Sequence, residues 1–271
     1  MSDRFLLDEL LKIRNNGGAC ALVTVARVQG SVPRRAGAKM IVYPDGTISG
    51  TVGGGKFESL VIESALEAMR HGAPTLKTFT LREDRPDSFG AICGGEATVF
   101  IEPESAAPHL GIVGGGHCAQ AIADLASKCG FAVSVMDDRK ELLGETFYAR
   151  TIRTVSDVTP AEFVRSWAWD AKDALIMVSR NFLIDREALA AALEYPEIGY
   201  VGMIGSRRKV LRVYDDLAAT GVDRSRLKHV FAPIGFDIAA ESPAEIAVSV
   251  VAEILKVLRG ASGNHLKLNV E

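Results

Sequence analysis

The chain has 271 residues, with 31 Lys and Arg against 34 Asp and Glu, which gives a formal net charge of −3. A hydrophobic share of 48% and a charged share of 24% fit a globular protein and argue against disorder or a fibre. The balance of charge offers no basic footprint for general nucleic-acid binding. No apolar run approaches the ~20 residues of a membrane-spanning helix, and the N-terminal stretch lacks a signal-peptide pattern. We therefore expect a cytoplasmic protein with neither nucleic-acid nor membrane partners.

The first half, residues 1–105, predicts an α+β domain. Apolar residues at helical spacing predict a first helix between Phe5 and Ile13, and a second helix is expected over Lys56–His71. The turn 44–46 (PDG) predicts a hairpin between two of the strands. Runs of strand combined with two helices indicate the α+β class. The expected strands are Ala19–Val28, Lys39–Tyr43, Thr47–Thr51, Leu76–Leu81 and Glu96–Ile101.

A linker is expected at Glu102–His109, where two prolines and small residues separate two differently patterned halves. Residues 106–259 then alternate short apolar strands with helices, which predicts a mostly parallel, Rossmann-like sheet with right-handed crossovers. Residues 260–271 are expected to form a C-terminal tail. The expected strands are Leu110–Val113, Ala132–Met136, Ala174–Val178 and Tyr200–Ile204, and the expected helices are His117–Cys129, Ala161–Trp167, Asp185–Leu193, Ser206–Leu217 and Pro243–Leu258.

A dinucleotide-binding fingerprint follows the first strand of the second half. Gly114, Gly116 and Ala119 fit the GxGxxA pattern, in which glycines allow a tight turn and close approach to a pyrophosphate at the next helix's N-terminus. Gly115 and His117 lie in the same turn, and Asp137 follows the next strand where a ribose-binding acid is expected. The pattern predicts a Rossmann-like scaffold, and NAD(P) is a possible ligand rather than a consequence of the fold.

Three glycine-flanked segments carry positive charge where an anion can dock. Arg34 and Arg35 lie in the loop 30–37, and Lys56 follows the glycine run Gly53, Gly54 and Gly55, whose backbone N–H groups can form an anion nest. Residues 205–209 place three cations in the first turn of a helix, against the helix dipole, unless a ligand anion compensates them. Each segment alone is as readily a solvated surface patch, but three together favour anionic ligand sites. The residues of the third segment are Ser206, Arg207, Arg208 and Lys209.

Cys93 is the candidate reactive thiol, because it lies among glycines that include Gly94 and Gly95. A thiolate is a soft ligand that suits a soft metal or sulfur chemistry, although a free cysteine is usually a small buried hydrophobe. Cys20, Cys118 and Cys129 fit that plainer interpretation. Without CxxC pairs, the four thiols favour reduced cysteines over a disulfide framework.

Together these motifs resemble the XdhC/CoxI family, the accessory proteins of xanthine dehydrogenase and related molybdenum hydroxylases. The resemblance spans nearly the whole chain. The matching segments are Gln29–Arg34 (QGSVPR), Gly50–Gly55 (GTVGGG), Cys93–Gly95 (CGG), Leu110–Gln120, Tyr200–Lys209 (YVGMIGSRRK) and Pro233–Pro243 (PIGFDIAAESP).

The resemblance implies an XdhC/CoxI domain joined to a Rossmann-like domain, and a chaperone more than a catalyst. Such proteins bind the molybdenum cofactor (molybdopterin), protect it while a cysteine desulfurase supplies its sulfido ligand, and deliver it to the apo-hydroxylase, commonly as dimers. Many relatives carry a histidine after the middle Rossmann strand, but residues 179–185 (SRNFLID) contain none. Any family role of that histidine is therefore in doubt in this chain.

The residues agree with that implication and leave rivals open. Glycine nests and arginines suit phosphate and oxo groups, and Cys93 suits the metal or its sulfur. The expected active surface lies between the first domain's loops and the second domain's glycine turn. One rival is an NAD(P)-dependent oxidoreductase using Gly114–Ala119 and Asp137, although no hydride-site acid or base stands out. Another is a dimeric scaffold that only docks the hydroxylase and the desulfurase.

Overall fold

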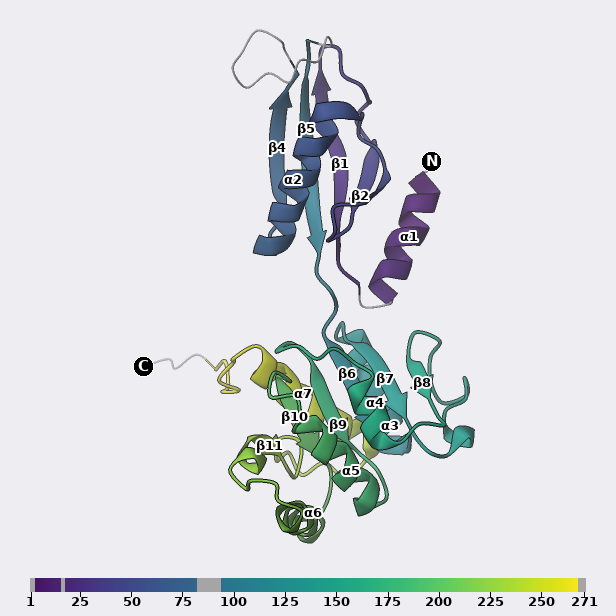
Figure 1. Cartoon of the computed structure of the whole chain (residues 1–271), viewed down its shortest axis with the longest axis vertical. Coiled ribbons are helices and arrows are strands. Elements are labelled where there is room, and N and C mark those ends of the chain that lie inside the picture. Colours follow the sequence, from purple (N-terminus) through teal and green to yellow (C-terminus); the bar gives the residue numbers. More distant parts are fainter. Residues whose placement is uncertain (1–2, 16–17, 82–93, 268–271) are drawn as a thin grey trace. The chain divides into compact units, whose positions relative to one another are not determined.

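The computed structural model describes residues 3–15, 18–81 and 94–267. Contacts divide the chain into two compact units, Met1–Ala107 and Pro108–Glu271, and each is described by itself (Figure 1). Between residue 3 and residue 267, in the segments just given, no helix has both the length and the apolar character needed to cross a membrane.

The first unit is built on a five-stranded antiparallel sheet in the order β3-β2-β1-β5-β4. The hairpin expected around the turn 44–46 is present, with Met40 opposite Gly50 and Val42 opposite Ile48. The longest strands, β1 and β5, pair at the centre of the sheet. The strands are β1 (Cys20–Gln29), β2 (Lys39–Val42), β3 (Ile48–Gly50), β4 (Thr75–Thr80) and β5 (Glu96–Glu104).

Helices cover both faces of this sheet because alternate residues of β1 point to opposite sides. Val23 and its neighbours on one face join the core made with α2 (Gly55–His71), which buries Phe57 and Val61. Cys20 on the other face packs with Leu6 of α1 (Asp3–Asn15). Figure 1 shows α2 lying along the sheet, with its N-terminus near the end where β1 finishes. This arrangement brings the loop after β1 close to the start of α2.

The second unit is a six-stranded parallel sheet in the order β11-β10-β9-β6-β7-β8. Counted from β6, this is the 3-2-1-4-5-6 order of a dinucleotide-binding Rossmann fold. The order reverses between β6 and β9, so their carboxyl ends flank the crevice where such folds bind ligands. The strands are β6 (His109–Val113), β7 (Ala132–Met136), β8 (Arg153–Val155), β9 (Ala174–Met177), β10 (Tyr200–Met203) and β11 (Val230–Phe231).

The helices of this unit start where the sequence carries capping residues. Ser242 caps α7 in the expected capping box with Glu245, and Thr159 caps α4 in the same way with Glu162. Asn181 caps α5. The helices are α3 (His117–Lys128), α4 (Pro160–Arg165), α5 (Phe182–Ala192), α6 (Arg207–Ala219) and α7 (Pro243–Leu258), with short 3-10 turns at Lys140–Leu142 and Arg226–His229.

The expected fold class, an α+β unit followed by a Rossmann-like parallel sheet, is confirmed. Two strands are additional to the prediction, β8 and β11, which are too short to show any period in the sequence. The linker is shorter than expected, because β5 continues to Glu104 and β6 begins at His109. Only residues 105–108 therefore connect the two sheets.

Candidate functional site

Three glycine loops of the first unit meet at one end of its sheet. Gly30 lies against Gly94 and Gly95, and Ser31 forms a bridge with Gly94. Pro33 packs so close to Gly53 that a Cβ there would lie 2.7 Å from the Pro33 Cβ. The structure thus joins the segments 29–34, 53–55 and 94–95, which lie far apart in the sequence.

The glycine run before α2 forms a nest whose donors face a carboxylate of the same helix. Gly53, Gly54 and Gly55 all have positive φ angles, of 148°, 77° and 63°. One oxygen of Glu58 accepts the backbone N–H groups of Val52 at 3.1 Å and Gly54 at 3.2 Å, and it also accepts the Thr51 hydroxyl. The anion that the sequence led us to expect in this nest is therefore supplied, in this structure, by Glu58.

The cations of this loop cluster face solvent. Arg34, Arg35 and Lys56 are all exposed, and neither arginine pairs with a carboxylate within the described part of the first unit. A Cβ placed on Gly54, Gly55 or Gly94 would meet open space, so the backbone here is accessible. Cys93, expected as the thiol of this cluster and as a metal ligand, lies outside the described residues. Within residues 3–15, 18–81 and 94–267, no group of Cys, His, Asp and Glu side chains is placed to hold a metal ion.

The glycine turn of the second unit lies at the carboxyl end of β6, as the fingerprint predicts. Gly114, with φ of 114°, approaches the backbone of Val178 and Ser179 so closely that a Cβ would lie 2.7 Å from a carbonyl. Gly116 precedes α3 without a side-chain cap and has open space where a Cβ would point, and His117 is exposed. Ala119 is fully buried. The tight turn at Gly114 and the small, packed residue at position 119 that this motif requires are therefore present, and the binding of a pyrophosphate by the turn stays a prediction.

Asp137, the expected ribose-binding acid, already has protein partners. It is 4% exposed, accepts the backbone N–H of Gly115 at 2.6 Å, and pairs with Arg139 through both carboxylate oxygens, each at 2.9 Å. Burial alone would raise the pKa of Asp137, but the hydrogen bonds from Arg139 and the Gly115 backbone outweigh it and lower that pKa to about 2. A ribose hydroxyl would have to compete with these charge-assisted bonds.

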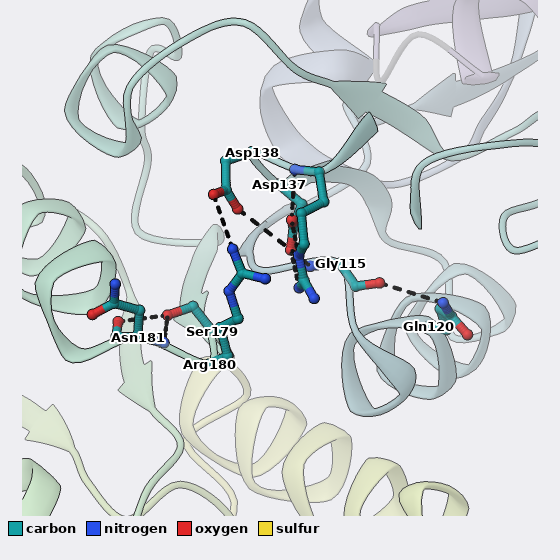
Figure 2. Close-up of polar contacts among 8 residues, drawn as sticks. Gly115, Gln120, Asp137, Asp138, Ser179, Arg180 and Asn181 are labelled. Atoms are coloured by element: carbon teal, nitrogen blue, oxygen red, sulfur yellow. Dashed lines mark hydrogen bonds and ion pairs between the residues drawn. The ribbon is translucent and has the colours of Figure 1, made fainter. Parts of the chain in front are cut away.

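Arg180 closes the other side of the same crevice. Figure 2 shows its guanidinium reaching from the loop after β9 toward Asp138, and the two ions lie 3.2 Å apart. Asp138 also lies 3.9 Å from Arg139, so two arginines and two carboxylates form one network beside Gly114. The cavity remaining there has a volume of about 10 Å³, which is room for about one water molecule. In this structure the charged side chains of the network therefore fill most of the space beside Gly114.

The third cationic segment divides into an exposed and a buried part. Ser206 caps α6 by accepting the backbone N–H of Lys209 at 3.3 Å, and Arg207 and Arg208 face solvent. Lys209 differs from the sequence expectation, because its ammonium forms an ion pair with Asp185, which is fully buried in the first turn of α5. The same ammonium donates to the Ser179 carbonyl at 3.0 Å. Lys209 therefore compensates a buried charge and joins α6 to α5.

Sequence reasoning missed Glu58, Arg139 and Asp185 as partners within the candidate sites. Each is an ordinary charged residue in the sequence, and its role depends on a loop or helix brought to it by the fold. One signal was available for Glu58, because an acid in the first turn of a helix favours free backbone N–H groups. The surface expected to be shared by the two domains stays a prediction.

Comparison with known proteins agrees with this arrangement. A model of the XdhC Rossmann domain matches residues 110–254, and a model of the XdhC and CoxI family matches residues 13–80. The uncharacterized protein YqeB of Escherichia coli K12 is 35% identical over 259 residues, covering 95% of this chain and 47% of YqeB. The chain thus spans about half the length of that relative.

Two further comparisons cover nearly the whole chain. The molybdenum cofactor insertion chaperone PaoD of Escherichia coli K12 is 26% identical over 286 residues, which is 94% of this chain and 87% of PaoD. A crystal structure named as a xanthine dehydrogenase from Bacillus halodurans superimposes with a TM-score of 0.51 at 23% identity, covering 96% of each chain, and shows that the fold is shared. With a family model matching more than half of its residues, the chain belongs to the XdhC and CoxI family.

Proposed function

We propose that this protein is an accessory chaperone that binds the molybdenum cofactor and inserts it into xanthine dehydrogenase or a related molybdenum hydroxylase. Membership of the XdhC and CoxI family supports this role, as does the similarity to a relative named as a molybdenum cofactor insertion chaperone. The cofactor is the cargo of such a protein, so binding and release are the activities to be explained.

The observation that carries the proposal is the meeting of the glycine loops in the first unit. The cofactor is a pterin with a phosphate tail and an oxygen- and sulfur-bound metal, and it needs donors for the phosphate and oxo groups. Arg34 and Arg35 supply exposed cations beside the accessible backbone of Gly54, Gly55 and Gly94. Guanidinium groups pair with phosphate in a bidentate geometry, which suits the tail. Cys93, which directly precedes Gly94 in the sequence, is the proposed ligand of the metal or its sulfur.

The nest itself tests whether the residues fit an anion. The Glu58 carboxylate in it supports this, because the backbone N–H groups of Val52 and Gly54 and the hydroxyl of Thr51 all donate to one of its oxygens. A phosphate can bind to the nest only if the Glu58 side chain moves out of it. Otherwise the phosphate must use other donors, which Arg34, Arg35 and Lys56 provide at the edge of the loop cluster. The fit therefore favours cargo that is held at the loop surface and is readily released.

The finer parts of the proposal follow the family resemblance. We extend the role to protecting the cofactor while a cysteine desulfurase supplies its sulfido ligand, with the protein acting as a cytoplasmic homodimer. The scaffold that only docks the two enzymes differs from this proposal in one respect, because it holds no cofactor.

The test is to purify the full chain from cells able to make the cofactor and to measure bound molybdenum and the fluorescence of the oxidised pterin. We expect both in near-stoichiometric amounts in the wild type. The double variant Arg34→Ala/Arg35→Ala is expected to lose at least tenfold in retained pterin, since each charge-assisted bond contributes ~1.5–3 kcal/mol. A protein that carries neither molybdenum nor pterin would contradict the proposal and favour the docking scaffold.

Matched controls separate the site from general charge. Arg70 is exposed at the opposite end of α2, so Arg70→Ala removes a cation from the same unit while leaving the loop cluster intact. We expect it to retain pterin like the wild type. Cys93→Ser tests the thiol separately, and unchanged pterin retention and hydroxylase activation in that variant would remove Cys93 from the site.

The NAD(P)-dependent oxidoreductase remains the second candidate because the strand order and the Gly114–Ala119 turn are those of a dinucleotide fold. The engagement of Asp137 by Gly115 and Arg139 weighs against it. Titration with NADH and NADPH decides the point, since saturable binding with turnover would favour the oxidoreductase.

A further inference from the structure

A second, larger cavity lies beside β10 and β11 of the Rossmann-like sheet, at the end of the strands opposite the glycine turn. It has a volume of about 640 Å³, within the ~300–1,000 Å³ range of small-molecule sites. Its walls come from the residues before and at the start of β10 and β11 and from the ends of α5 and α7, so the cavity lies at the amino ends of these two strands. The glycine turn after β6 lies at the carboxyl ends, and the two sites are therefore distinct.

The lining of this cavity combines an apolar floor with cations. Ile198, Val201 and Val257 contribute aliphatic surface, and Tyr195 and Phe231 contribute aromatic rings. Arg226, Lys228 and His229, which belong to the 3-10 turn before β11, add positive charge or donors. None of the described residues that line the cavity is acidic. An apolar body and an anionic group would both find partners here.

These cations have no close ion-pair partner in the described part of the chain, although one carboxylate, that of Asp223, lies near both of them. No carboxylate pairs with Arg226 or Lys228 in the described part of the chain, whereas the neighbouring Arg224 is paired with Asp215 at 2.5 Å. The carboxylate of Asp223 accepts the backbone N–H and the hydroxyl of Ser225, and these bonds, together with the nearby charges of Arg226 and Lys228, lower the pKa of Asp223. Arg226 and Lys228 lie in the field of this exposed acid but leave their direct hydrogen-bond donors available to a ligand.

The cations are also not needed to cap the C-terminal carbonyls of the two helices that end at the cavity. At the end of α5, the carbonyls of Leu189, Ala191 and Ala192 accept backbone N–H groups of the next residues. At the end of α7, the carbonyls of Leu255, Lys256 and Val257 are satisfied in the same way. Because these carbonyls already have donors, capping by a side chain is not required.

We propose that this cavity binds a small organic anion with a flat aromatic body, namely a nucleotide. Its ring system would lie on the apolar floor beside Tyr195 and Phe231, and its phosphate would pair with Arg226 and Lys228. This inference does not depend on the proposed chaperone role, because the cargo loops belong to the first unit and this cavity to the second.

The probe is flavin mononucleotide, which is flat, fluorescent and phosphorylated, with riboflavin as the matched compound that lacks the phosphate. Titration of the full chain should give saturable binding of flavin mononucleotide and at least tenfold weaker binding of riboflavin. Arg226→Ala and Lys228→Ala are each expected to weaken flavin mononucleotide about tenfold, the size expected for one charge-assisted bond. Both residues are exposed, so neither variant should change the unfolding temperature by much.

The control is Lys128→Ala, which removes an exposed lysine of α3 that pairs with Asp124 and does not line the cavity. It should bind the probe like the wild type. Competition by GMP should displace flavin mononucleotide, whereas displacement by a phosphorylated pterin but not by GMP would contradict a nucleotide site. Equal affinity for the two flavins, an unchanged affinity in both cavity variants, or no saturable binding would each overturn the proposal.

Discussion

Glu58 accepts the backbone N–H of Gly54 at 3.2 Å, so a side chain of α2 occupies the anion nest at the start of the same helix. The glycines provide the conformation and the helix dipole favours negative charge there. Glu58 stabilises the helix start while keeping a ligand anion from the same donors. Glu58 therefore competes with a ligand anion for these donors and lowers the affinity of the loop cluster for it.

Removing this competitor should change stability and anion binding in opposite directions. We expect Glu58→Ala to lower the free energy of unfolding by about 1 kcal/mol, because the first turn of α2 loses its capping acid. Inorganic phosphate or molybdate should then stabilise the variant more than the wild type, since the vacated N–H groups bind the added anion. The measurement is the unfolding temperature across a series of phosphate and molybdate concentrations.

The matched control for that experiment is Glu67→Ala, which removes an exposed carboxylate from the same helix away from the nest. It should show the wild-type response to both anions. An equal response of all three proteins would mean that Glu58 does not guard a binding site.

The close approach of Pro33 to Gly53 predicts that replacing Gly53 with alanine lowers the free energy of unfolding more than replacing Gly55 does. Both have positive φ, but a Cβ on Gly53 would collide with Pro33 at 2.7 Å, whereas one on Gly55 would meet open space. Gly55→Ala should cost about 1 kcal/mol from backbone strain alone, and Gly53→Ala should cost at least ~2 kcal/mol and separate the two loops. Urea unfolding of the two variants measures the difference, and equal costs would contradict the packing described.

The elements with strong local signals could be predicted from the sequence. Pro243–Leu258 carries its capping box and a full apolar period, and Ala132–Met136 is a buried apolar run, so both match the structure. The partners in the site could not be predicted in this way. Lys209 and Asp185 lie on different helices, so the sequence does not show that they pair. From the sequence alone, Lys209 is equally compatible with a bound ligand anion.

The state of Asp137 predicts a specific acid sensitivity. Its pKa is lowered to about 2 in the folded protein, from an ordinary value of 3.8, so it stabilises the fold by about 2 kcal/mol above pH 5. Because a lowered carboxyl pKa means that the unfolded chain binds the proton first, this stabilisation is lost as the pH falls from about 5 to about 2. Asp137→Asn should be less stable at neutral pH and lose less on acidification. Urea unfolding between pH 7 and pH 3 tests this, and parallel profiles would contradict it.

The same network gives a prediction for nucleotide binding. Arg139→Ala frees both oxygens of Asp137 from their guanidinium partner and removes one wall of the crevice. If the second unit is a nucleotide site, this variant should bind NADH more tightly than the wild type, as measured by fluorescence titration. Arg150→Ala is the control, because Arg150 is 84% exposed and pairs only with Glu145 among the described residues. Equal affinities in all three proteins would remove the Asp137 network as the barrier.

Lys209 and its two neighbours predict opposite effects within a single helical turn. Lys209→Ala leaves the fully buried carboxylate of Asp185 without its cation, and breaking a buried pair in this way costs ~3–5 kcal/mol. Arg207 and Arg208 are exposed at the positive end of α6, so replacing either with Ala should leave stability unchanged or raise it by up to ~1 kcal/mol. Urea unfolding of the three single variants measures these differences. The double variant Lys209→Met/Asp185→Asn should be more stable than the single variant Lys209→Met, because it leaves no unpaired charge buried between the two helices. Equal effects of all three alanine variants would mean that the Lys209 ion pair contributes nothing to the fold.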